Sequence, residues 1–287
     1  MFKRVLVSLI ALSLFGLAMT PWKRLLTQQE LRQDLLPTES LEGQNSLNQQ
    51  LAFVSLGGLR SLVAAFLSLE ASECFRNSDW PTLEKRYHQT VTLSPHNVFY
   101  WDTGAWHLAY NAASDALDQE QLPLSERRQI YKNYIDKGKA FLLQGVHQNP
   151  SDWVVLSRLG NLLSDPRRYP NYEEARAAYQ KARQLGGPNI IARQEFYSLA
   201  RIPSKAKEAW QLGRQLYQDP SNRMPSLATT LFALENRLNL PESQRIPFRE
   251  LFPSDKLARS AMLKQLSNGL NYPTDGLREA LEKLPDN

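Results

Sequence analysis

The stretch WVVLSRLGNLLSDPRRYPNYEEARAAYQKARQLGGP, residues 153–188, decides the fold. Its first half places apolar side chains at steps of three and four residues, and its second half repeats that spacing with Ala175, Tyr179 and Ala182. Such steps put side chains on one face of an α-helix. The polar break DPRRYPN separates the halves, and Pro188 ends the second. The stretch therefore predicts two antiparallel helices with a short connection.

The second half of this stretch has three weaker copies, each with small and bulky residues at the same spacing. They contain Leu83, Tyr87 and Thr90; Gly138, Leu142 and Gly145; and Ala206, Trp210 and Gly213. Small residues let neighbouring helices approach, and a bulky one fills the gap between them. Prolines that stop a helix follow the four copies at positions 95, 150, 188 and 220. No alternating strand pattern interrupts them, so the chain is predicted to be all-α.

These helix pairs resemble the tetratricopeptide repeat (TPR), a unit of about 34 residues with two helices and a closing proline. Leu156, Leu159 and Gly160 match the W-x-x-L-G of that family, with leucine in place of tryptophan, and Leu163 replaces its tyrosine. The closing prolines stand 55, 38 and 32 residues apart, so the array is degenerate. The resemblance implies a TPR-like α-solenoid of antiparallel helix pairs. Residues 57–113 also look like a group of uncharacterised bacterial membrane-anchored helical-repeat proteins, which brings no assigned activity.

The uncharged run VLVSLIALSLFGLAMTPW, residues 5–22, is flanked by Lys-Arg pairs at 3–4 and 23–24. As a helix it would span about 27 Å, close to the roughly 30 Å core of a bilayer. It is interpreted as an uncleaved signal anchor, as a secretory signal cut near Ala18, or as a buried core helix. The length and the flanks favour the anchor, and five fully apolar turns disfavour the core helix. We expect a single-pass membrane protein with its body outside the cytoplasm, or alternatively a secreted or periplasmic protein.

The positive charge belongs mainly to the ends of this run. The net charge is +5, and the four flanking cations leave 30 basic against 29 acidic side chains. Nucleic-acid binding needs basic residues gathered on one face, and none is visible, so nucleic acid is excluded as a partner. The single cysteine, Cys74, rules out an internal disulfide and a four-cysteine zinc site, and its apolar surroundings predict a buried side chain.

The composition changes along the chain and predicts four parts. These are a signal anchor or signal peptide (1–24), a polar linker (25–50), TPR-like repeats (51–223) and a C-terminal helical cap (224–287). Residues 51–68 carry one charge, Arg60, and a second membrane span is conceivable there. Because a central arginine is costly in lipid, we predict a buried or bundle-facing helix that starts near Gly58. Whether residues 51–69 contact the membrane stays open.

Motifs for metal, cofactor or nucleophilic chemistry are missing from the sequence. The four histidines, His88, His96, His107 and His147, form no pair at i and i+4 with an acid, so no metal site is predicted. The sequence has no G-x-S-x-G and no phosphate loop, and the single S-x-x-K, Ser204 to Lys207, lacks its companion motifs. We expect no cofactor and no catalytic residue.

A partner-binding groove is the remaining candidate site. In the aromatic segment 98–112, five positions recur at helical steps and predict a core face: Val98, Trp101, Ala105, Leu108 and Ala112. Tyr100, Asp102 and His107 are then free to face a groove. The TPR resemblance implies that first helices line it, which adds Asn111, Arg158 and Asn161.

The function expected from this groove is non-catalytic. The chain would be a scaffold or accessory subunit of a bacterial envelope complex and would bind a peptide or helix of a protein partner. Two alternatives stay open. One is an envelope glycan-acting enzyme with a superhelical fold. The other is a purely structural packing partner of a membrane protein, through residues 51–69.

Overall fold

The computed structural model describes residues 59–267 and 271–285, and within these ranges all regular structure is helical. The prediction of an all-α chain is confirmed. The α-helices are α4 (Arg60–Arg76), α5 (Trp80–Leu93), α6 (Val98–Trp106), α7 (Ala113–Asp118), α8 (Leu124–Gln148), α9 (Trp153–Ser164), α10 (Tyr172–Gln184), α11 (Asn189–Ala200), α12 (Ala206–Tyr217), α13 (Pro225–Arg237), α14 (Phe248–Leu251), α15 (Asp255–Ser267) and α16 (Leu277–Glu282). A π-helix, η1 (His107–Ala112), joins α6 to α7. Short 3₁₀ turns are η2 (Pro203–Lys205), η3 (Pro220–Asn222) and η4 (Glu242–Gln244).

The predictions for the N-terminal anchor or signal (1–24) and for the linker (25–50) lie outside the described residues. Among the described residues, no helix combines the length and apolarity that a membrane crossing requires.

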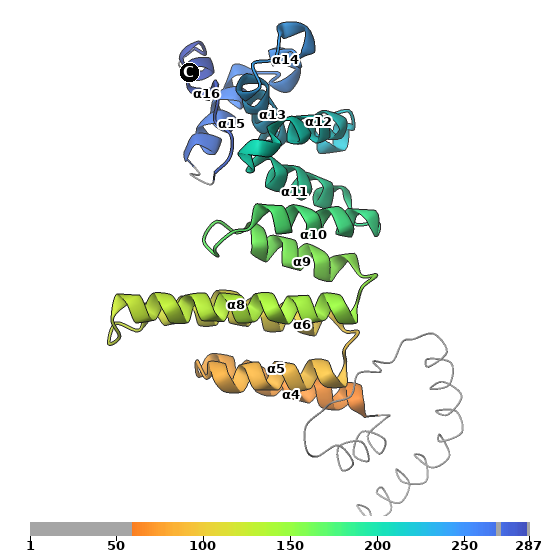
Figure 1. Ribbon diagram of the computed structural model, residues 1–287, viewed down its shortest axis with the longest axis vertical. Helices are drawn as coiled ribbons and strands as arrows, with labels where there is room; N and C mark the ends of the chain where they lie inside the picture. The colour runs from red at the N-terminus through yellow and green to blue at the C-terminus, as the bar shows by residue number, and fades with distance from the viewer. Residues whose placement is uncertain (1–58, 268–270, 286–287) are drawn as a thin grey trace, which may run out of the picture.

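The helices pack in chain order, one above the other along the long axis of the molecule (Figure 1). Five pairs form: α4 with α5, the continuous α6–η1–α7 with α8, α9 with α10, α11 with α12, and α13 with α15. Successive pairs meet through α5 and α6, α8 and α9, α10 and α11, and α12 and α13. The first helices of successive or neighbouring pairs also contact one another: α6 contacts α9, and α11 contacts α13.

The predicted breaks fall between these helices for local reasons. Pro95, Pro150, Pro188 and Pro220 follow the ends of α5, α8, α10 and α12. A proline cannot continue a helix, and it biases the preceding residue toward extended backbone. Polar caps then start the next helices: Asn97 accepts from the backbone N–H of Phe99, and Asp152 accepts from that of Val154 at 2.7 Å.

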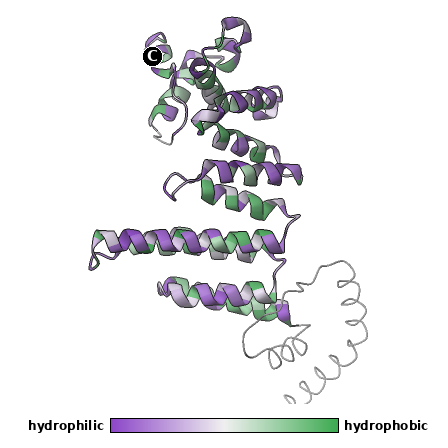
Figure 2. Ribbon diagram, viewed as in Figure 1, coloured by the Kyte–Doolittle hydropathy of each residue, from purple (hydrophilic) through white to green (hydrophobic). Residues whose placement is uncertain are grey.

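Buried apolar side chains form the core between the helices. Figure 2 shows that hydrophobic and hydrophilic residues occur together in these helices. One core cluster extends from Ala71 in α4 to Ile191 in α11, and a second extends from Phe196 in α11 to Leu284. The small residues of the repeat pattern permit the close contacts. A Cβ added at Gly138 would lie 2.6 Å from the Ala109 Cβ.

The deciding stretch forms the pair α9 and α10, and its break is anchored to α8. The Asn171 side chain caps α10 and also donates to Glu174 at 2.8 Å, as in a capping box. Arg168 from the break lies over the rings of Tyr110 and Tyr131, 4.9 and 5.3 Å from their centroids. The long α8, which projects beyond the helices above and below it (Figure 1), supplies Tyr131.

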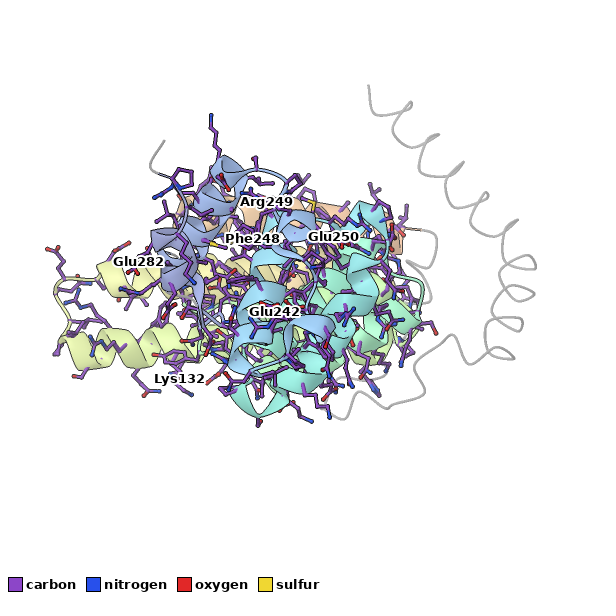
Figure 3. All side chains as sticks on the ribbon, turned by 90° about the horizontal axis from the view of Figure 1, so that it is seen from above. Lys132, Glu242, Phe248, Arg249, Glu250 and Glu282 are labelled. Carbon is purple, nitrogen blue, oxygen red and sulfur yellow. The ribbon has the colours of Figure 1, made fainter. Side chains whose placement is uncertain are left out.

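The C-terminal part, predicted to be helical, contains α13, α14, α15 and α16. Figure 3 looks down the molecule, and the labelled Phe248, Arg249 and Glu250 lie together on the short α14 at this end. The ring of Tyr272 lies 3.9 Å from the Arg201 guanidinium, so this part also contacts the end of α11. The second core cluster runs through both α11 and this part.

Candidate functional site

An open pocket of about 290 Å³ lies between the first helices of two successive pairs. The α6–η1 segment forms one wall, α9 forms the other, and α8 contributes to the floor. The lining residues are Asp102, Ala105, Trp106, Tyr110, Leu142, Arg158, Asn161 and Leu162. Three of the six predicted site residues therefore come together here: Asp102, Arg158 and Asn161.

An ion pair joins the two walls of the pocket. Arg158 Nε lies 2.9 Å from Asp102 Oδ2, and both side chains remain partly exposed. Burial raises the pKa of the Asp102 carboxyl, and the Arg158 charge and hydrogen bond oppose that rise. Because both groups are in reach of solvent, the pair contributes little to stability. Its charged groups remain available to a ligand.

Two aromatic side chains give the pocket its apolar surface. The Trp106 side chain is 49% exposed although its helix is otherwise well packed. Tyr110 is more enclosed, and burial raises its pKa to about 12, so its hydroxyl stays protonated at neutral pH. Both residues lie at the junction of α6 with η1. Single π-helical turns inside α-helices occur frequently at functional sites.

Asn161 lines the pocket but also supports the fold. Its Oδ1 accepts a hydrogen bond of 2.8 Å from the hydroxyl of Tyr179. The Tyr179 side chain is fully buried in the first core cluster and packs against Gly160. Replacing Asn161 would remove a hydrogen-bond acceptor from the buried Tyr179 hydroxyl and so weaken the fold. Asn161 is therefore a poor choice for a binding test.

The other three predicted residues do not line the pocket, although the His107 ring lies 5.2 Å from that of Trp106. His107 is 8% exposed, and its ring lies 4.8 Å from that of Phe75 and 5.7 Å from that of Tyr87. Asn111 is hydrogen-bonded to His107 Nδ1 at 3.0 Å. Tyr100 is half-buried and packs against the first core cluster. The structure does not bring these three into the pocket.

Trp106 and Tyr110 line the pocket but were not predicted as site residues. The aromatic segment was predicted mainly to form a core face, and four of its residues are indeed buried: Trp101, Ala105, Leu108 and Ala112. A second row of residues runs beside that face: Phe99, Thr103, Trp106 and Tyr110. Its three- and four-residue spacing was the signal that could have identified them.

Metal-ligating side chains do not gather anywhere in the described part of the chain: it holds no group of three or more His, Cys, Asp or Glu that could bind an ion. Cys74 is half-buried against the first core cluster, so the prediction of a buried side chain holds only in part. In comparison with known proteins, no family model matches the chain and no curated protein is significantly similar to it.

Proposed function

We propose that this chain is a non-catalytic interaction scaffold, or an accessory subunit, of a bacterial envelope complex. Its helix pairs would form a TPR-like solenoid, and the groove along its first helices would bind a peptide or a helix of a protein partner. The observation that carries the proposal is the pocket between α6–η1 and α9, which contains a half-exposed tryptophan beside an ion pair.

The chemistry of this pocket suits a protein ligand. Interface residues that dominate affinity are enriched in Trp, Tyr and Arg, in partly enclosed sites surrounded by other contacts. Trp106, Tyr110 and Arg158 provide these three residue types on two walls of one pocket. The apolar floor of Leu142 and Leu162 accepts an aliphatic or aromatic side chain, and the ion pair offers one acceptor and one donor beside it.

A glycan-acting enzyme is the second candidate, and the raised pKa of Asp102 is the observation that favours it. Most glycoside hydrolases use a pair of carboxyl groups on either side of the scissile bond. Asp102 is the single carboxylate in the pocket lining, and it is paired with Arg158. This arrangement favours binding over hydrolysis.

The proposed location is the cell envelope, with residues 5–22 as the membrane anchor. This part of the proposal rests on the length and flanking charges of that run. Sequencing the N-terminus of the mature protein tests it. An intact Met1 agrees with an anchor, and a first residue at Met19 would instead indicate a cleaved signal.

Quantitative crosslinking and mass spectrometry in native membranes test the groove. The double variant Trp106→Gln with Arg158→Gln removes the exposed ring and the guanidinium without touching the buried Tyr179. A tryptophan in an interface centre contributes about 2 kcal/mol or more, so we expect partner crosslinks to fall more than about tenfold. Circular dichroism and the unfolding midpoint should stay close to those of the wild type.

The matched control is Leu124→Gln with Arg128→Gln, which removes one exposed apolar side chain and one exposed cation from α8. It should keep the partner crosslinks. If partner crosslinks fell equally in both variants, or fell in neither, this pocket would be excluded as the binding site. Glycan cleavage that Asp102→Asn abolishes would establish the enzymatic alternative, and crosslinks confined to α4 would favour the structural one.

A further inference from the structure

The first described helix, α4, carries a row of large apolar side chains that point away from its buried face. Leu62, Phe66 and Leu69 are 66%, 59% and 69% exposed, and Leu59 at the start of the helix is 41% exposed. Steps of three and four residues place these four side chains, the α4 stripe, on one face of the helix. Isolated exposed apolar residues are common, but a continuous row of them marks a contact surface.

The first helices of the other pairs have a neighbouring helix that α4 lacks among the described residues. In each of them, the first helix lies between the second helix of its own pair and that of the preceding pair: α6 contacts α5 and α8, α9 contacts α8 and α10, and α11 contacts α10 and α12. Within the described residues, α4 has its main contacts with α5 alone. Helical repeats bury their core by covering one another, so an uncovered first helix calls for one more helix before it.

The sequence directly before α4 has the spacing of such a helix. Residues 44–56, QNSLNQQLAFVSL, carry no charge and end at the pair Gly57–Gly58. Leu47, Leu51 and Val54 stand at steps of four and three, which puts them on one helical face. Two glycines end a helix readily and allow a tight turn between two antiparallel helices.

The two rows also match in register. When two antiparallel helices meet at a short turn, residues at equal distances from the turn lie opposite one another. Counted from Gly58, Val54 and Leu62 both lie 4 residues away, Leu51 and Phe66 lie 7 and 8 residues away, and Leu47 and Leu69 both lie 11 residues away. Each of these three side chains of the α4 stripe therefore has an apolar counterpart in residues 44–56.

We propose that residues 44–56 form a helix that packs antiparallel on the α4 stripe and closes this end of the helical array. The occupant of the surface is thus the chain itself, since the 58 residues before Leu59 lead directly into α4. One consequence is that residues 23–43 alone connect the apolar run 5–22 to the folded body. The inference is independent of the proposed groove.

A disulfide-trapping experiment on the full chain in native membranes tests the register. In a Cys74→Ser background, Leu47→Cys is combined with Leu69→Cys, and the control combines Gln49→Cys with Leu69→Cys. Loop-closure entropy depends only weakly on length, so a freely moving segment would bridge at similar rates from positions 47 and 49. A docked helix turns position 49 away from α4, and we expect the 47–69 bridge to form about tenfold faster under mild oxidation.

Peptide mass spectrometry separates the outcomes of this experiment. A fast intramolecular 47–69 bridge supports the proposal. Equal rates for the two pairs would show that the segment does not dock in this register, and a 69–69 bridge between two chains would assign the stripe to a second copy instead. Either result overturns the proposal.

Hydrogen exchange provides a second test that introduces no cysteine. Leu51→Asp places a charge against the α4 stripe, whereas Phe53→Asp places the same charge on the opposite side of the proposed helix. We expect faster exchange of the α4 amides in the first variant and wild-type exchange in the second. The same effect in both variants, or in neither, would contradict the proposed packing.

Discussion

Gly138 shows how one residue controls the approach of two helices. It lies in α8 against the α6–η1 segment, and a Cβ at this position would lie 2.6 Å from the Ala109 Cβ and 2.9 Å from the Ala105 carbonyl oxygen. The carbonyl belongs to the backbone, so it cannot move aside as a flexible side chain would. The spacing pattern predicted a small residue here, and the packing explains why it has no side chain.

The substitution Gly138→Ala tests this contact. Helix propensity alone would favour alanine by about 1 kcal/mol, whereas overpacking typically costs about 1–3 kcal/mol. We expect a net loss of up to about 2 kcal/mol in the free energy of unfolding, measured by chemical denaturation. A stabilised Gly138→Ala variant would mean that α8 and η1 are less closely packed than described.

His107 connects the stability of the molecule to pH. Burial lowers the pKa of the His107 imidazole from its ordinary value of 6.5, and Asn111 is hydrogen-bonded to its Nδ1. The unfolded chain therefore takes up this proton more readily than the folded one. The stability contributed by neutral His107 is present above about pH 6.5 and is lost as the pH falls below it.

The variant His107→Phe should reduce this pH dependence. Phenylalanine keeps the contacts with Phe75 and Tyr87 but cannot be protonated, so stability should fall less between about pH 7 and pH 5 than in the wild type. Burial also lowers the pKa of His88, which should preserve part of the slope. Denaturation curves at several pH values provide the measurement, and an unchanged slope would exclude His107 as a source.

At the scale of the element, the break between α9 and α10 belongs to the packing of α8. Arg168 lies over Tyr110 and Tyr131, and it donates to the Tyr131 hydroxyl and to Ser114 Oγ. The same tyrosine donates to the Arg167 carbonyl. The break, residues 165–171, thus reaches across to α8, and its Arg168 lies against Tyr110 at the pocket.

Arg168→Ala should therefore lower the free energy of unfolding more than Arg167→Ala does. Arg167 is the neighbouring control, and its side chain is 82% exposed. Loss of the stacked guanidinium and its hydrogen bonds should cost about 1–2 kcal/mol, while the control should stay within about 0.5 kcal/mol. Thermal unfolding of both variants provides the comparison. Equal effects would show that the break is not anchored through Arg168.

At the scale of the whole molecule, the core is divided rather than continuous. The first cluster ends at Ile191 and the second begins at Phe196, both within α11. Contacts connect mainly helices that are neighbours in the chain. Regions with separate cores can open separately, so local stability is expected to differ between the two parts.

Hydrogen exchange in the variants Leu231→Ala and Leu83→Ala tests this division. Both side chains are fully buried, one in each cluster, and truncating a buried leucine typically costs about 2–5 kcal/mol. Leu231→Ala should speed exchange in α12, α13 and α15 but not in α5 and α8, and Leu83→Ala should do the reverse. A uniform increase along the chain would indicate one cooperative unit.

The helical elements could be predicted from the sequence because local chemistry sets them. Prolines end the helices, polar side chains such as Asn97 and Asp152 start the next ones, and three- and four-residue steps mark the faces. Half of the predicted site residues, Asp102, Arg158 and Asn161, lie in the pocket because α6 and α9 face each other there. His107 and Asn111 could not be excluded, since His107 is buried by Phe75 and Tyr87, which belong to other helices.

The sequence by itself determined that the regular structure of the described residues is helical and that prolines follow the ends of α5, α8, α10 and α12. Tertiary structure alone decided that Asp102 meets Arg158, that Asn161 supports Tyr179, and that Trp106 remains half-exposed beside them. The physical reason is that capping and periodicity act within a few residues along the chain. A pocket depends on which side chains of separate helices face one another, and only the packing of α6, α8 and α9 fixes that.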